Sequence, residues 1–220
     1  MASVTTHDHA HDHGHDHDHH GPGPWTRIFT TTNHKDIGSM YLWFSLLMFF
    51  VGGAMALLIR AELFTPGLQV VQPEVFNSLT TVHALVMIFG AVMPAFVGFA
   101  NWLIPLQIGA ADMAFPRMNN WSFWLMIPAT VLLMASFFVP GGAAASGWTL
   151  YPPLSTQGGI GVDMTIIAIH ILGASSIMGS INIITTILNM RAPGMTLMRM
   201  PMFVWTWLIT AYLIIAVMPV

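Results

Sequence analysis

The sequence predicts an all-α membrane protein built as a bundle of transmembrane helices. Hydrophobic residues make up 55% of its 220 residues and charged residues only 7%, whereas an average soluble domain contains roughly 25% charged residues. Five apolar stretches also have about the 20 residues that a helix needs to cross the hydrocarbon core of a bilayer. These stretches are residues 40–59, 78–105, 121–139, 164–190 and 201–220.

The first 24 residues differ from these stretches. Residues 7–20 are mostly histidine and aspartate, and such a polar, low-complexity tract cannot form a packed core. We therefore expect residues 1–24 to be a disordered cytoplasmic tail. The tail would hold zinc or copper at most adventitiously, because its spacing fixes no coordination geometry. It has no basic start followed by an apolar core, so we expect no cleavable signal peptide.

Charge and cysteine content limit the classes of function. The net charge is −3 and the six Lys and Arg residues are scattered, which leaves no basic patch for nucleic acid. The chain has no cysteine, so a metal would need histidine, methionine, carboxylate or carbonyl ligands. The eighteen methionines are better explained as gap-filling core side chains than as copper ligands.

The loops between the stretches alternate sides and divide the basic residues unequally. One side carries Arg27, Lys35, Arg117, Arg191 and Arg199. The other side carries Arg60. Because cytoplasmic loops are rich in Lys and Arg, this bias predicts a cytoplasmic N-terminus. The last stretch has no polar flank, so we expect residues 25–220 to be helices 1 to 5 of a larger subunit, truncated at the C-terminus.

A candidate ligand lies in the second stretch, at a depth that this orientation defines. At a rise of 1.5 Å per residue, His83 lies about 8 Å inside the outer boundary. It begins a helical stripe that continues with Gly90, Pro94, Gly98 and Asn101. Such a face suits either a flat macrocycle beneath an axial imidazole or a closely packed neighbouring helix. Periodicity alone favours helix packing with a hydrogen-bonded histidine.

Polar side chains also share one face of the fourth stretch. They are Ser175, Asn182, Thr186 and Asn189. A stripe of this kind suits a file of water molecules or a set of interhelical hydrogen bonds, and the spacing does not separate the two. His170, in the outer third of the same stretch, is expected to be packed or hydrogen-bonded, and we assign it no metal.

Five runs of sequence carry a family resemblance. They are TTNHKDIG (31–38), LLIRAEL (57–63), TVHALVMIFGAVMPAFVGFANWLIPLQIGAADMAFPRMNN (81–120), GWTLYPPL (147–154) and LGASSIMGSINIITTILNM (172–190). Together they closely resemble subunit I of the cytochrome c oxidases, which are haem-copper oxidases. The resemblance covers about residues 26–220, and GAADMAFPRMNN is its most specific motif. It implies that the chain is the first five helices of a subunit of roughly twelve.

The resemblance implies three residues that contact haem. His83 would be an axial ligand of the iron of the low-spin haem A, whose other ligand lies beyond residue 220. Arg60 would hydrogen-bond the formyl group of that haem, and Trp148 would hydrogen-bond a propionate of the oxygen-binding haem. The alternatives are an interfacial anchor for Arg60 and an aromatic-belt anchor for Trp148. The second haem, the copper and their ligands would lie C-terminal to this segment, so we expect the segment alone to be inactive.

A proton channel is also implied by the resemblance. Its residues would be Asp112 at the cytoplasmic opening, Asn101 and Asn119 next to it, and Ser175, Ser176 and Asn182 further inside. Ionised carboxylates collect protons, and amide and hydroxyl groups hold the water that relays them. We leave Thr186 and Asn189 as structural residues. The alternative for Asp112 is a solvated loop carboxylate with Arg117 as its surface partner.

Two further residues match a cation site near the outer face. They are Glu62 and Gly67, and the residues between them, Phe64 and Thr65, depart from the Gly-Gln that is common in the family. Glu62 therefore remains a candidate cation ligand.

As a whole, the resemblance implies the catalytic subunit of a terminal respiratory oxidase in a bacterial inner (plasma) membrane. It would reduce oxygen to water with electrons from cytochrome c and pump protons, with other oxidase subunits and membrane lipid as partners. The first alternative is a quinol oxidase, which favours a His and a Gln shortly before the haem ligand; residues 76–81 contain neither. The second is a metal transporter or channel, which would need paired ligands within the helices, where His83 and His170 are the histidines available.

Overall fold

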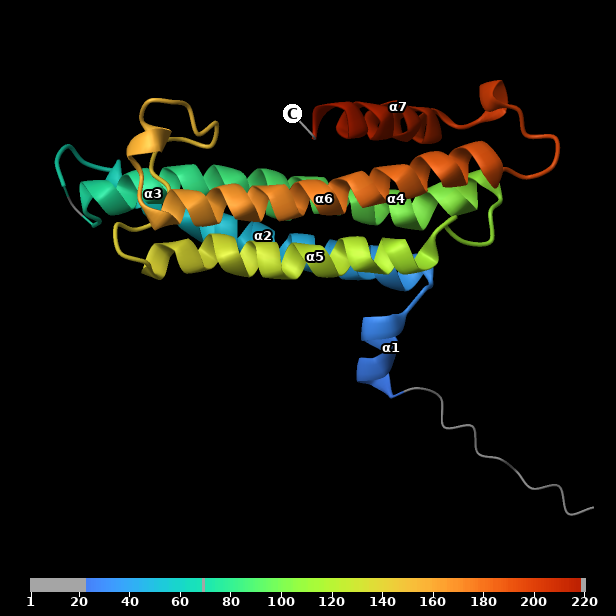
Figure 1. Cartoon of the computed structure of the whole chain (residues 1–220), viewed down its shortest axis with the longest axis horizontal. Helices are drawn as coiled ribbons and strands as arrows, with labels where there is room; N and C mark the ends of the chain where they lie inside the picture. The colour runs from blue at the N-terminus through green and yellow to red at the C-terminus, as the bar shows by residue number, and fades with distance from the viewer. Residues whose placement is uncertain (1–22, 69, 219–220) are drawn as a thin grey trace, which may run out of the picture.

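The computed structural model describes residues 23–68 and 70–218, which form helices and loops. Four spans lie side by side along the long axis of the molecule: α2 (His34–Glu62), α3 (Pro73–Leu85) continued by α4 (Met93–Ile108), α5 (Pro116–Ala135) and α6 (Ile160–Asn189). A further helix, α7 (Met202–Val217), packs along α6, and the short α1 (Pro24–Thr30) projects from the bundle (Figure 1). The remaining elements are the wide helical turn η1 (Val86–Val92) and the 3₁₀ turns η2 (Ser136–Phe138), η3 (Ser155–Gln157) and η4 (Leu197–Arg199).

Four of the predicted apolar stretches are confirmed as helices long and apolar enough to cross a membrane, and the fifth is a shorter apolar helix, α7. Each of the four long helices begins four to six residues before its apolar stretch, whereas α7 lies within the fifth stretch. At the start of α2, for example, the Asn33 side chain accepts a hydrogen bond of 2.8 Å from the backbone nitrogen of Lys35 and so caps the helix. Most of the predicted tail, residues 1–22, lies outside the described residues.

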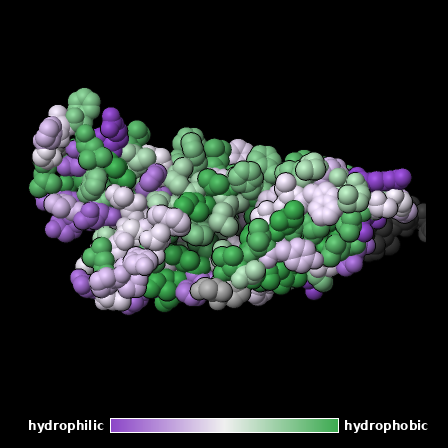
Figure 2. Space-filling view, turned by 90° about the horizontal axis from the view of Figure 1, so that it is seen from above, coloured by the Kyte–Doolittle hydropathy of each residue, from purple (hydrophilic) through white to green (hydrophobic). Residues whose placement is uncertain are grey.

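Large apolar side chains cover the middle of the molecule. Trp43, Phe50 and Leu57 on α2 are 72%, 65% and 72% exposed, and Val131 on α5 is 61% exposed. Hydrophobic residues dominate the central surface, whereas hydrophilic residues gather mainly towards the two ends (Figure 2). Exposed apolar surface on this scale is expected of helices that face lipid.

The second span is continuous from α3 to α4 but changes its winding in the middle. Residues Val86–Val92 form a π-helix, in which the backbone nitrogen of Met93 donates to the carbonyl of Ile88. Pro94 follows directly, and its ring nitrogen cannot donate a backbone hydrogen bond. Ser45 on α2 donates to the carbonyl of Ala91 over 2.7 Å, which satisfies one acceptor within this widened segment.

Helices α2 and α4 cross at two glycines. A Cβ atom added at Gly38 would lie 3.0 Å from the carbonyl oxygen of Gly98, and one added at Gly98 would lie 3.0 Å from that of Gly38. Small residues allow two membrane helices to approach this closely. The crossing fixes the position of the residues one turn away on each helix, which include His34 and Asn101.

The predicted grouping of basic residues agrees with the fold. Arg27, Lys35, Arg117, Arg191 and Arg199 all lie where helices begin or end on one side of the bundle, which we call the basic end (at the right in Figure 1). Arg60 lies in the last turn of α2, at the opposite end.

Candidate functional site

His83 is oriented by a neighbouring helix. It is half-buried on α3, and its Nδ1 lies 2.9 Å from the carbonyl oxygen of Gly52 on α2. A carbonyl can only accept, so Nδ1 carries a proton and donates it to Gly52. Metal-binding histidines show this arrangement, in which the second ring nitrogen donates to a carbonyl or carboxylate. The contact with Gly52 thus leaves Nε2 as the ring nitrogen that could take a further partner.

The stripe that follows His83 packs against α2. Gly90 faces Met48, with 3.1 Å between the side chain and an added Cβ atom, and Gly98 faces Leu42 and the backbone of α2. The helix-packing interpretation of these two glycines is confirmed. The π-helix that begins three residues after His83 was not predicted; such turns often occur at functional sites, and Pro94 was the signal available for it.

Arg60 and Trp148 lie towards the same end of the bundle as His83. Gly52, which contacts His83, is eight residues before Arg60 on α2, or about 12 Å along the helix axis. The loop that carries Trp148 is tied to α3, because the backbone nitrogen of Gly147 donates to the Thr81 hydroxyl over 3.0 Å. Both the Arg60 side chain and the Trp148 side chain, which is 49% exposed, are accessible to a bound group.

At the basic end, the structure brings together Asp112, Asn101 and Asn119 through a residue that was not predicted, His34. One Asp112 carboxylate oxygen accepts from the backbone nitrogens of His34 (3.3 Å) and Met113 (2.7 Å). The His34 ring, which is 5% exposed, contacts the carbonyl of Asn101 over 2.8 Å. The Asn119 amide donates to the Asn101 side-chain oxygen over 2.6 Å.

These contacts correct the alternative interpretation of Asp112. Among residues 23–68 and 70–218 the ion pair present is that of Arg27 with Asp36, and Asp112 forms none with Arg117. The Asp112 carboxylate instead lies at the N-terminus of α2, where the exposed backbone N–H groups and the helix dipole favour a negative charge. The sequence signal for His34 was its place in the TTNHKDIG run.

Hydroxyl groups continue this polar cluster towards the middle of the bundle. The Ser122 hydroxyl lies 2.7 Å from the carbonyl of Asn119 and 2.8 Å from the Tyr41 hydroxyl. Ser175 on α6 donates to the carbonyl of Ser122. Tyr41, Ser175 and Ser176 then line a cavity of about 40 Å³, which is large enough for two or three water molecules. These contacts connect Asn101 of α4, Asn119 and Ser122 of α5, and Ser175 of α6 into one row of polar residues, which we call the track.

Asn182 and Thr186 have a different role from Ser175. The Asn182 side-chain oxygen accepts from the backbone nitrogen of Phe115 over 2.8 Å, and the Thr186 hydroxyl accepts from that of Ala114 over 2.9 Å. Both side chains therefore anchor the loop that carries Asp112. The Thr186 contact agrees with the structural role expected of it, and the Asn182 contact gives this side chain a structural role beside the channel role predicted for it.

Glu62, at the end of the bundle opposite the basic end, holds the loop that follows α2 through its side chain. Its carboxylate accepts from the backbone nitrogens of Val70 (2.6 Å) and Val71 (3.0 Å), and the side chain is 6% exposed. The carboxylate thus holds the chain that follows α2 against the helix end.

His170 is exposed on α6, and its Nδ1 lies 2.8 Å from the carbonyl of Ile166 in the preceding turn. The prediction of a hydrogen-bonded histidine is confirmed. Within the part of the chain that the structure describes, no three His, Asp or Glu side chains gather as a metal site.

Comparison with known proteins adds a family to this geometry. Residues 36–220 match the family model described as cytochrome c and quinol oxidase polypeptide I. Similar proteins include cytochrome c oxidase subunit 1 of Corynebacterium efficiens, 51% identical over 87% of this chain and 34% of the relative. The probable cytochrome c oxidase subunit 1-alpha of Streptomyces avermitilis is 49% identical over the same shares. Cytochrome c oxidase subunit 1 of Cereibacter sphaeroides is 44% identical over 100% of this chain and 43% of the relative. The chain spans about a third of the length of the first two.

Proposed function

The chain belongs to the cytochrome c and quinol oxidase polypeptide I family, and from this we propose that it forms part of the catalytic subunit of a terminal respiratory oxidase. The whole subunit would reduce oxygen to water with electrons from cytochrome c and pump protons. This segment would supply one ligand of a low-spin haem and the opening of a proton channel. The observation that carries the proposal is the orientation of His83.

His83 fits an axial ligand of haem iron. The carbonyl of Gly52 holds Nδ1, so the ring cannot turn without losing this hydrogen bond, and Nε2 remains available to the metal. A bound low-spin haem A would supply reversible one-electron transfer. Arg60 and Trp148, at the same end of the bundle, would donate hydrogen bonds to polar substituents of the haem groups, and such bonds adjust reduction potentials.

The track from Asp112 to Ser175 suits proton uptake from the basic end. Asp112 is half-buried, so its carboxylate is still reached by water at the basic end, and it accepts a hydrogen bond from the first turn of α2. The 2.6 Å hydrogen bond between Asn119 and Asn101 leaves no room for water between these amides. A proton relay past them therefore requires the two side chains to separate, after which the hydroxyl groups of Tyr41 and Ser175 would hold water in the 40 Å³ cavity.

The charge distribution supports a cytoplasmic basic end in a bacterial inner membrane. Five described basic residues lie at that end and one at the other, and the relatives named above come from bacteria. Those relatives are described as cytochrome c oxidases, which favours cytochrome c over quinol as the electron donor. Other oxidase subunits and membrane lipid would be the remaining partners. Cation binding by Glu62 would require its carboxylate to bind the ion in addition to the two backbone groups.

A reduced-minus-oxidised absorption spectrum of the full-length membrane protein tests the proposal. An a-type haem band is expected, and His83→Ala should abolish the low-spin component. His170→Ala is the matched control, because His170 is exposed and bonded to its own helix; it should retain the band. A b-type band would favour the quinol alternative, and a protein without haem, or a low-spin band retained in His83→Ala, would refute the proposal.

A further inference from the structure

A groove at the basic end lies beside the loop that carries Asp112. Its volume is about 490 Å³, within the range of binding sites for small ligands. Its lining residues are Thr32, Ala114, Phe115, Pro116, Arg117 and Met118. Thr32 belongs to the segment before α2, and the others belong to the end of the Asp112 loop and the first turn of α5. The groove therefore adjoins both the Asp112 loop and the chain that leads to the N-terminus.

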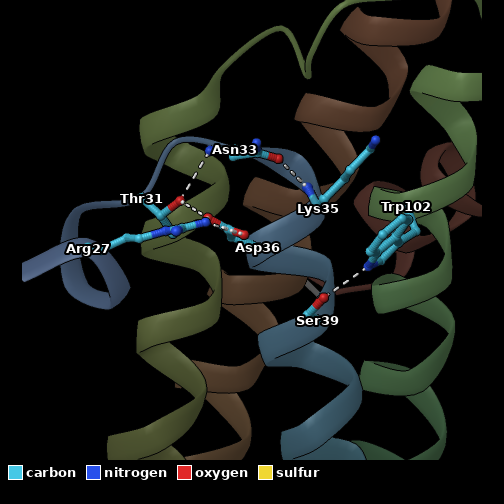
Figure 3. Close-up of polar contacts among 7 residues, drawn as sticks. All are labelled: Arg27, Thr31, Asn33, Lys35, Asp36, Ser39 and Trp102. Carbon is cyan, nitrogen blue, oxygen red and sulfur yellow. Dashed lines mark hydrogen bonds and ion pairs between the residues drawn. The ribbon is translucent and has the colours of Figure 1, made fainter. Parts of the chain in front are cut away.

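Arg117 gives this groove a positive charge that the described residues do not neutralise. Other cations at the basic end are engaged. Arg27 pairs with Asp36 at 3.0 Å, and the Lys35 ammonium lies 5.6 Å from the centre of the Trp102 ring (Figure 3). Arg117 is exposed, and among the described residues no hydrogen bond or ion pair involves its guanidinium. The groove is therefore suited to an anionic group.

The basic end as a whole has more positive than negative charge. Beside its five cations, its titratable groups are Asp36, Asp112 and the buried His34. Arg191 donates to backbone carbonyls. Arg199 lies in the turn before α7, which packs on the side of the bundle away from α1 (Figure 1). Among the cations without a partner in the described residues, Arg117 is thus the one on the α1 side.

The chain contains an anionic segment of its own, the tract at residues 7–20, which lies outside the described residues. We call it the His/Asp tract; it contains four aspartates, eight histidines and no Lys or Arg. Because an ordinary histidine titrates near pH 6.5, the tract carries four negative charges at higher pH. Below this pH the protonated histidines outnumber the aspartates. The basic end therefore attracts the tract above about pH 6.5 and repels it at lower pH.

The His/Asp tract is long enough to reach the groove. α1 separates the tract from the bundle and, with seven residues, spans about 10 Å. At the far end of α1, the Asn120 amide donates to the carbonyls of Phe29 and Thr31, which holds the chain one turn along α5 from Arg117. Residues 7–22 can span up to about 50 Å, which is more than this separation. Covalent attachment gives the tract an effective concentration of about millimolar, so weak exposed ion pairs suffice.

We propose that the His/Asp tract docks in the groove at Arg117 at neutral and higher pH, with its aspartates towards the guanidinium, and leaves it when its histidines are protonated. The tract suits the groove better than a soluble anion does, because it is present in every copy of the chain. Docking would bring imidazole groups, which exchange protons near neutral pH, next to the Asp112 loop. That consequence rests on the proposed proton channel, whereas the docking itself does not.

Photo-crosslinking in the full-length membrane protein tests the docking, with EDTA present so that no metal ion occupies the tract. Benzoylphenylalanine in place of Phe115, which is 45% exposed in the groove, should capture residues 7–20 at least fivefold more at pH 8 than at pH 5.5. Peptide mass spectrometry identifies the product. Arg117→Gln should reduce capture at pH 8 about two- to fivefold, the effect of losing an exposed ion pair, and Arg117→Lys should restore it.

Two controls accompany this measurement. The same crosslinker in place of Phe138, which is 89% exposed at the opposite end of α5, should capture none of the tract. Arg199→Gln removes a cation outside the groove and should leave capture unchanged. Far-UV circular dichroism checks that the variants fold.

Three results would overturn the proposal. Capture of a lipid or of another subunit at position 115, and not of the tract, would show a different occupant. Equal capture at the two pH values, or unchanged capture after Asp8, Asp12, Asp16 and Asp18 are replaced by Asn, would remove the role of charge. An equal loss in Arg117→Gln and Arg199→Gln would indicate diffuse attraction to the basic end. None of these measurements depends on haem or on oxygen reduction, so their failure is distinguishable from failure of the proposed function.

Discussion

The crossing of α2 and α4 gives a prediction whose size can be worked out from the structure. A Cβ atom added at Gly38 would lie 2.7 Å from Cδ1 of Trp102, 3.0 Å from the carbonyl oxygen of Gly98 and 3.2 Å from Cβ of Asn101. The carbonyl belongs to the helix backbone and cannot rotate away, so Gly38→Ala must push the helices apart or shift Trp102. Gly53 is the matched control on the same helix, because an added Cβ meets nothing within 4 Å.

Both substitutions remove the same entropic cost of folding a glycine into a helix, which stabilises each variant by about 0.5–1 kcal/mol. The difference between them therefore measures the clash, which for overpacking is about 1–3 kcal/mol. Unfolding of the full-length protein by SDS in mixed micelles, followed by tryptophan fluorescence, should show Gly38→Ala to be less stable than Gly53→Ala by this amount. Equal stability of the two variants would refute the argument that the crossing depends on backbone contact.

Three other predictions concern the basic end. Asp112→Asn should slow proton uptake at least tenfold while the protein remains folded, because the amide oxygen still accepts the two backbone hydrogen bonds; pH-indicator kinetics would check this, with Asp163→Asn as the control. Thr186→Val leaves the backbone nitrogen of Ala114 without its acceptor and should cost about 1–3 kcal/mol, measured as a lower melting temperature; an unchanged temperature would contradict the anchoring role. Arg27→Gln breaks an exposed ion pair (Figure 3) and should cost less than about 1 kcal/mol, a loss that disappears in 1 M salt.

The spans could be predicted from the sequence because transfer of a helix into lipid depends on local composition. The apolar stretch 40–59 identifies the lipid-facing part of α2, but the helix runs from His34 to Glu62. Its additional turns depend on caps and on contacts with distant residues, such as the bond from the His34 backbone to Asp112. A hydropathy pattern contains no information on these contacts.

The members of the proposed proton track were predicted in part. Asp112, Asn101 and Asn119 come from a single recognisable run of sequence, and they do lie close together. The different roles of two α6 residues were not predictable, because Ser175 and Asn182 lie on one helical face and both have uncharged polar side chains. Only the position of the loop at Phe115 distinguishes them, since it lies against Asn182 and leaves Ser175 to line the cavity.

Packing and polar chemistry are coupled at the basic end. His34 lies one turn before Gly38 on α2, and Asn101 lies one turn after Gly98 on α4, so both residues lie just beyond the crossing on the same side. The 2.8 Å contact between the His34 ring and the Asn101 carbonyl is possible because the glycines let the two backbones approach. A larger residue at the crossing would lengthen this contact and also move the Asn101 amide relative to Asn119. The glycines therefore determine the geometry of the proposed channel opening, although neither has a side chain that could carry a proton.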